Sequence, residues 1–147
     1  MPQATDYQSI GFIGLGKLGL PCAAAMQVKT GVRLLGYDIN PLVQNYIESA
    51  TVPYMERNIE DYLSEAQIEF CKNVSEVVME SEVVFLAIQT PHDPSFEGVT
   101  PVPDQTQDFD YSFLVDAIDS IVSALKSHPE KYLDIVVIST VLPGTLR

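Results

Sequence analysis

The residues whose spacing points most directly to chemistry form a G-x-G-x-x-G motif. Its glycines are Gly14, Gly16 and Gly19. They follow an apolar run at 9–15 and open a helical pattern at 18–29. In such a turn the first glycine permits a tight bend, the second lets the backbone approach a pyrophosphate, and the third lets helix and strand pack closely. The free N–H groups and the dipole of the helix N-terminus favour phosphates, so Lys17 and Leu18 join the glycines as candidate cofactor-binding residues.

An acidic residue follows at the expected distance. Asp38 ends a second apolar run at 33–38, nineteen residues after Gly19. At this position a carboxylate accepts hydrogen bonds from the adenosine ribose of NAD and repels a 2′-phosphate. The alternative is a purely structural turn with a solvated aspartate. The order strand, glycines, helix, strand and aspartate favours dinucleotide binding, with NAD preferred over NADP.

The rest of the chain alternates short apolar runs with helical patterns, which is typical of βαβ units. The predicted strands are 9–15, 33–38, 68–71, 83–89 and 133–139, and the predicted helices are 18–29, 41–49, 58–65, 76–79 (with Ser75 as N-cap) and 111–126. We therefore expect an α/β fold, a Rossmann-type doubly wound parallel sheet in a three-layer αβα arrangement. Residues 1–147 form one domain with five strands, and a sixth strand is expected beyond Arg147.

Further polar residues follow the fourth and fifth predicted strands. Thr90-Pro91 follows the fourth, and Ser139-Thr140 ends the fifth. Ligands of open parallel sheets lie outside the carboxyl ends of the strands, so these residues should converge with the glycine turn and Asp38. The threonines either bind a ligand or cap the strand ends; position alone does not decide. The proline-rich loop 90–109 between them is long enough to indicate a functional or mobile segment.

Composition restricts the possible partners. Lys and Arg number 8 against 20 Asp and Glu, a net charge of −12, which disfavours nucleic acid and anionic membranes. No apolar run is long enough to span a bilayer, and the N-terminus lacks the features of a signal peptide. Two cysteines, Cys22 and Cys71, favour the cytoplasm and core packing rather than disulfides. The histidines show no zinc-ligand spacing, so no metal site is expected.

Taken together, the motifs resemble those of the UDP-glucose/GDP-mannose dehydrogenase family. The segments that carry the resemblance are 11–21 (GFIGLGKLGLP), 36–38 (GYD), Thr90-Pro91 and 139–145 (STVLPGT), with weaker agreement at 53–56 and 108–111. The resemblance covers nearly the whole chain, but only the N-terminal NAD-binding domain of such enzymes.

The resemblance implies a reaction, the oxidation of a nucleotide-sugar C6 alcohol to a carboxylate in two NAD-dependent steps. It also implies that Thr90 and Thr140 contact NAD and that Thr140 helps to position a catalytic water. The family's cysteine nucleophile and its lysine and aspartate partners belong to segments beyond this chain. We therefore expect the chain alone to be inactive, the nucleotide sugar to need those segments, and homodimers to be an option for the full-length enzyme.

The sequence departs from the family's pattern at two positions, and two other hypotheses for its function remain open. Val43 occupies a position where the family often has a basic residue, and Lys17 replaces an aromatic one. Lys17 either approaches the pyrophosphate or is simply solvated.

The β-hydroxyacid dehydrogenases share an opening like residues 11–21, but membership of that family explains Thr90-Pro91 and the loop after it less well. A nucleotide-binding module without catalysis is the alternative from another class.

Overall fold

The sheet of this protein is parallel throughout and carries the whole architecture. A computed structural model describes residues 7–96 and 107–146, so residues 97–106 of the predicted loop 90–109 lie outside the described residues. Within them the strands are β1 (Ser9–Ile13), β2 (Arg33–Tyr37), β3 (Ile68–Phe70), β4 (Val83–Leu86) and β5 (Asp134–Val137). They lie in the order β3-β2-β1-β4-β5, and the pairs are parallel. The strand order reverses between β1 and β4, which confirms the doubly wound fold.

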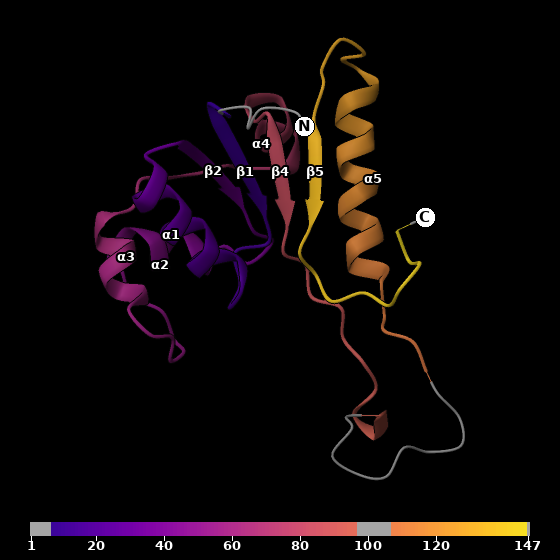
Figure 1. Cartoon of the computed structure of the whole chain (residues 1–147), viewed down its shortest axis with the longest axis horizontal. Helices are drawn as coiled ribbons and strands as arrows, with labels where there is room; N and C mark the ends of the chain where they lie inside the picture. The colour runs from indigo at the N-terminus through magenta and orange to yellow at the C-terminus, as the bar shows by residue number, and fades with distance from the viewer. Residues whose placement is uncertain (1–6, 97–106, 147) are drawn as a thin grey trace, which may run out of the picture.

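Helices cover the sheet on both faces. They are α1 (Gly19–Thr30), α2 (Leu42–Ser49), α3 (Ile59–Glu65), α4 (Val74–Glu80) and α5 (Ser112–Lys126), with a short 3₁₀ turn, η1, at Pro94–Phe96. Figure 1 shows α1, α2 and α3 together on one side of the sheet and α5 alongside β5. This is the predicted three-layer arrangement.

Alternation along the strands divides the core into two clusters. In β1, Phe12 faces the cluster built with α1, α2 and α3, and Ile13 faces the cluster built with α4 and α5. Phe12 is fully buried and stacks on Phe85 of β4, with ring centroids 5.0 Å apart. Burying each such large apolar side chain contributes roughly 1.5–3 kcal/mol, and these contacts join β1 to β4 at the switch point.

Both cysteines take part in this packing, as expected. Cys22 lies against the first cluster and Cys71 within the second, and neither is paired. Burial raises the pKa of the Cys71 thiol, which disfavours its reactive thiolate form.

Element ends differ from the predictions in two ways. The strands are shorter at their carboxyl ends: β1 stops at Ile13, because Gly14 turns the chain with φ 89°, and β4 stops at Leu86 rather than Gln89. The predicted N-cap at Ser75 is wrong, because α4 begins at Val74, two residues before the predicted start, and its N-cap is Asn73, whose Oδ1 accepts a hydrogen bond from the N–H of Glu76.

Candidate functional site

The carboxyl ends of β1, β2, β4 and β5 carry the predicted site residues. Because the strands are parallel, these ends share one edge of the sheet. Main-chain hydrogen bonds continue past the strands there: the N–H of Gly14 donates to the carbonyl of Tyr37 at 2.9 Å, and that of Ala87 to the carbonyl of Ile13 at 2.9 Å. The turn after β1 is thereby fixed against both neighbouring strands.

The glycines of the turn meet different requirements. Gly14 has φ 89°, and a Cβ on Gly19 would lie 2.0 Å from the carbonyl oxygen of Gly14. Gly16 is different: its φ is not positive, and a Cβ built on it meets nothing within 4 Å. Each of the other described glycines either has a positive φ or lies so close to a neighbouring group that a Cβ would clash, and Gly16 has neither property. Its missing side chain leaves room for a ligand, as a pyrophosphate site requires.

The start of α1 offers unused hydrogen-bond donors. Its N-cap residue, Leu18, makes no side-chain capping bond, and the N–H groups of Leu18 and Gly19 have no acceptor among the described residues. Lys17 is exposed and has no ion-pair partner in the same part of the chain. These are the orphan donors and the positive dipole end that favour an anion.

Asp38 is joined to the glycine turn. Its Oδ2 accepts a hydrogen bond from the N–H of Leu15 at 2.7 Å, and its Oδ1 accepts one from the N–H of Asn40 at 2.8 Å. Each carboxylate oxygen has a further lone pair, so the group can still accept ribose hydroxyls. Val43, by contrast, is only 3% exposed and belongs to the core.

The two threonines meet, as the parallel topology predicts. The hydroxyl of Thr90 donates to the carbonyl oxygen of Thr140 at 2.7 Å. Next to them, Oγ of Ser139 accepts a hydrogen bond from the N–H of Ile88 at 3.0 Å. The side-chain hydroxyl of Thr140 has no partner among the described residues and Thr140 is exposed, so this hydroxyl is free to bind a ligand or a water. Pro91, also exposed, continues the segment beyond Thr90.

One residue without a predicted role belongs to the same edge. The phenol oxygen of Tyr111 donates to Oδ1 of Asp108 at 2.7 Å and accepts a hydrogen bond from the N–H of Leu142 at 3.1 Å. The D-x-x-Y spacing of Asp108 and Tyr111 is the signal in the sequence that points to it.

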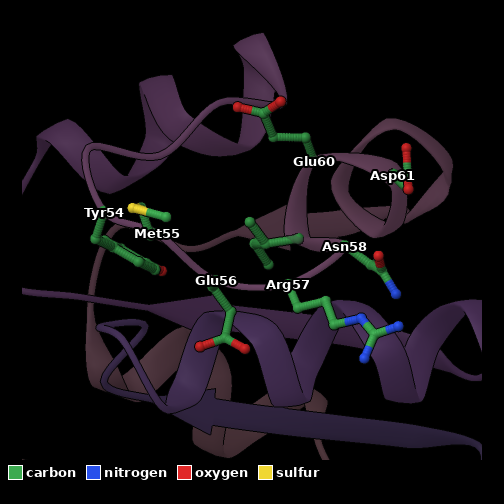
Figure 2. A pocket seen from close by; sticks show the side chains of 8 residues that line it. Tyr54, Met55, Glu56, Arg57, Asn58, Glu60 and Asp61 are labelled. Carbon is green, nitrogen blue, oxygen red and sulfur yellow. The ribbon is translucent and has the colours of Figure 1, made fainter.

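Two hollows on the surface contain none of the predicted site residues. One, of about 610 Å³, is lined by the single stretch 54–61; Figure 2 shows Tyr54 and Met55 on one side of it and Arg57 and Asn58 on the other. The second, of about 650 Å³, lies between the start of α4 and the later part of α5. Neither hollow is lined by residues of the glycine turn.

Two features are absent from the part of the chain that the structure describes. Within 7–96 and 107–146, no three His, Cys, Asp or Glu side chains are grouped to hold a metal ion. In the same part of the chain, none of the helices has the length and apolar character needed to cross a membrane.

The fold and the edge residues define a class of protein. A turn with space at Gly16, an uncapped helix start and an acid after β2 are the features of a dinucleotide-binding Rossmann domain. The model of the UDP-glucose/GDP-mannose dehydrogenase family, NAD binding domain, matches residues 8–147. The chain belongs to this family of dehydrogenases, and the cofactor of the domain is NAD.

Solved structures agree with this assignment. A UDP-glucose dehydrogenase from the archaeon Pyrobaculum islandicum is 25% identical with a TM-score of 0.76, over 99% of this chain and 32% of that one. A GDP-mannose dehydrogenase from Pseudomonas aeruginosa is 25% identical with a TM-score of 0.77, over 93% of this chain and 29% of that one. A UDP-N-acetyl-mannosamine dehydrogenase from Staphylococcus aureus is 29% identical with a TM-score of 0.68, over 94% and 30%.

These matches decide between the enzyme families that the sequence left open, in favour of the nucleotide-sugar dehydrogenases. Curated protein sequences give no match. The chain spans about a third of the length of the solved relatives.

Proposed function

We propose that NAD binds across the carboxyl edge of the sheet, with its pyrophosphate at the glycine turn. The single observation that carries this is the unfilled space at Gly16 beside the free donors at the start of α1. The pyrophosphate is held by backbone N–H groups of the segment 16–19 and by the helix dipole, with Lys17 as a flexible counter-charge. A site built from backbone suits a chain with a net charge of −12, because the overall field is screened within roughly 8 Å.

The two halves of NAD then lie on opposite sides of β1. The strand order reverses between β1 and β4, and a dinucleotide lies across such a switch point. The adenosine ribose is held by Asp38, whose charge disfavours the 2′-phosphate of NADP. The nicotinamide half lies over Thr90, Pro91 and Thr140.

The reaction we propose is the oxidation of a nucleotide-sugar C6 alcohol to a carboxylate. This change removes two hydrides, each taken up by one NAD, adds one water, and releases three protons to the solvent. It is supported by the family and by the names of the solved relatives, which act on UDP- or GDP-linked sugars. In this reaction the free hydroxyl of Thr140 would orient the water.

We propose that residues 1–147 are the N-terminal domain of a longer dehydrogenase. The edge of β5 has no neighbouring strand among the described residues, and its Ile135 and Val136 are 43% and 37% exposed. A further strand and the substrate domain would cover this surface. The nucleotide sugar, and a homodimer, therefore belong to the longer protein, and the chain alone is inactive. Unpaired Cys22 and Cys71 support the cytoplasm as its location.

Calorimetry of the 147-residue chain with NAD and with NADP tests the binding site. We expect NAD to bind at millimolar or lower concentration, and NADP more weakly. Equal heats from the chain and from Asp38→Ala would contradict the assignment of the site. A separate assay with NAD and UDP-glucose should give no NADH; robust NADH production would refute the claim that the chain is inactive alone.

A further inference from the structure

Three segments at the carboxyl edge are tied into a closed triangle of hydrogen bonds. The segment after β4 is joined to the segment after β5 by the hydroxyl of Thr90, which donates to the carbonyl of Thr140 at 2.7 Å. The segment after β4 is joined to the start of α5 by the N–H of Asp110, which donates to the carbonyl of Pro91 at 2.7 Å. The third side joins α5 to the segment after β5.

That third side depends on one side chain. The phenol oxygen of Tyr111 accepts a hydrogen bond from the N–H of Leu142 at 3.1 Å, whereas the bond of the second side is backbone to backbone. The same phenol donates to Asp108 at 2.7 Å, and this fixes the direction of its lone pairs toward Leu142. A substitution at Tyr111 can therefore open one side of the triangle and leave the other two formed.

Aromatic contacts hold the Tyr111 ring in the position from which its phenol oxygen reaches the N–H of Leu142. Its centroid lies 6.3 Å from that of Phe109, and Phe109 in turn meets the ring of His92 edge-on at 6.2 Å. Such aromatic pairs stabilise each other beyond the effect of the area that they bury. The ring contacts survive a change that removes only the phenol oxygen.

The triangle lies on one side of the switch point. It connects the ends of β4 and β5 with α5, whereas the glycine turn and Asp38 lie at the ends of β1 and β2. A dinucleotide across the switch point therefore has only one half over the triangle. That half is the nicotinamide and its ribose, if the proposed NAD site holds.

We infer that Tyr111 is a positioning residue for the nicotinamide half of the cofactor. Its phenol fixes the backbone two residues beyond Thr140, so that the hydroxyls of Thr90 and Thr140 keep one relative position. Because Thr90 uses its proton on the Thr140 carbonyl, its oxygen is left as an acceptor, and the Thr140 hydroxyl is free to donate. Tyr111 acts through these groups and does not itself touch the reacting atoms. This inference rests on the proposed function.

The test compares Tyr111→Phe with the parent chain for two ligands. NAD occupies both halves of the site, whereas ADP carries only the adenosine and the two phosphates. Tyr111→Phe removes both hydrogen bonds of the phenol oxygen. The loss of the bond to Leu142 should weaken NAD binding by about three- to tenfold and leave ADP binding within about twofold of the parent. Tyr132→Phe is the matched control, because Tyr132 also donates to an aspartate, Asp134 at 3.0 Å, but precedes β5 at its amino end. It should change neither affinity.

The outcomes separate this inference from the proposed function. An equal loss for NAD and ADP, or no loss for NAD, overturns the role of Tyr111. A parent chain that binds neither ligand overturns the proposed NAD site as well. If Tyr111→Phe does not fold, judged by thermal melting, Asp108→Asn replaces it: the amide oxygen is a weaker acceptor for the phenol, so a smaller loss confined to NAD supports the inference, and an equal loss for both ligands overturns it.

Discussion

The N–H of Leu15 donates a 2.7 Å hydrogen bond to the carboxylate of Asp38, which joins the glycine turn after β1 to the end of β2. The second carboxylate oxygen is held by the N–H of Asn40 at 2.8 Å. Asp38 is thus a structural element of the turn as well as the proposed ribose ligand. The position of the acid is fixed before any cofactor arrives, so the site loses little freedom on binding.

Asp38→Ala should therefore weaken both folding and binding. Two N–H groups lose a charged acceptor, and we expect unfolding to become easier by about 2 kcal/mol and NAD affinity to fall about tenfold or more. Thermal melting and calorimetry measure the two effects. Asp116→Ala, on the exposed face of α5, is the control and should change neither.

Asp38→Asn separates charge from hydrogen bonding. The amide keeps one acceptor oxygen but no longer repels a 2′-phosphate, so the preference for NAD over NADP should narrow. The ratio of the two dissociation constants is the measurement. An unchanged ratio would argue that Asp38 does not face the adenosine ribose.

Two glycines of the turn should respond oppositely to the same substitution. Gly16→Ala places its Cβ in open space, whereas Gly19→Ala places one 2.0 Å from the carbonyl oxygen of Gly14. We expect Gly16→Ala to fold with an unchanged melting temperature and to lose NAD binding about tenfold or more, because the methyl group occupies the pyrophosphate position.

Gly19→Ala should instead lower the melting temperature clearly, because backbone must shift to relieve the contact. Both variants are compared by thermal melting and by NAD titration. A Gly16→Ala variant that binds NAD like the parent would remove the main support for the phosphate site.

The sequence was sufficient to predict the placement of those candidate residues whose position follows from local order and from sheet topology. The glycine turn and Asp38 depend on the succession strand, turn, helix and strand, which a single sequence displays. The meeting of Thr90 and Thr140, 50 residues apart, follows because adjacent parallel strands end at one edge.

The bond between Tyr111 and Leu142 could not be predicted in the same way. It depends on how α5 is placed over the ends of β4 and β5, which is a matter of tertiary packing and leaves no periodic signal. The N-cap of α4 shows a local limit, because Asn73 and Ser75 are both good capping residues. Which one caps depends on where the helix starts, and that is decided by tertiary packing.

The ion pairs of Arg33, the first residue of β2, predict that stability depends on pH. Arg33 donates two 2.8 Å hydrogen bonds to the carboxylate of Glu69, and this lowers the pKa of Glu69 from its ordinary 4.5. A lowered carboxyl pKa adds stability that is fully present above the ordinary value and is lost as the pH falls through the value in the folded protein. Both side chains are about half exposed, so the effect is small.

Glu69→Gln should therefore lower the melting temperature slightly at pH 7, and the difference from the parent should shrink below about pH 4.5 and in concentrated salt. Glu65→Gln, at an exposed glutamate of α3, is the matched control and should have no such dependence. If the difference in melting temperature between Glu69→Gln and the parent grows as the pH falls, this prediction is wrong.

The start of α4 allows a paired test of its capping residue. Oδ1 of Asn73 accepts a hydrogen bond from the N–H of Glu76 at 2.9 Å, and the Glu76 carboxylate accepts one from the N–H of Lys72 at 2.8 Å. Two N–H groups at the start of the helix therefore have side-chain acceptors, as in a capping box. Asn73→Ala removes the cap and should cost about 1 kcal/mol of stability, whereas Ser75→Ala, at an exposed position inside the helix, should be nearly neutral. Chemical denaturation of both variants measures the difference, and equal losses would mean that Asn73 does not cap the helix in solution.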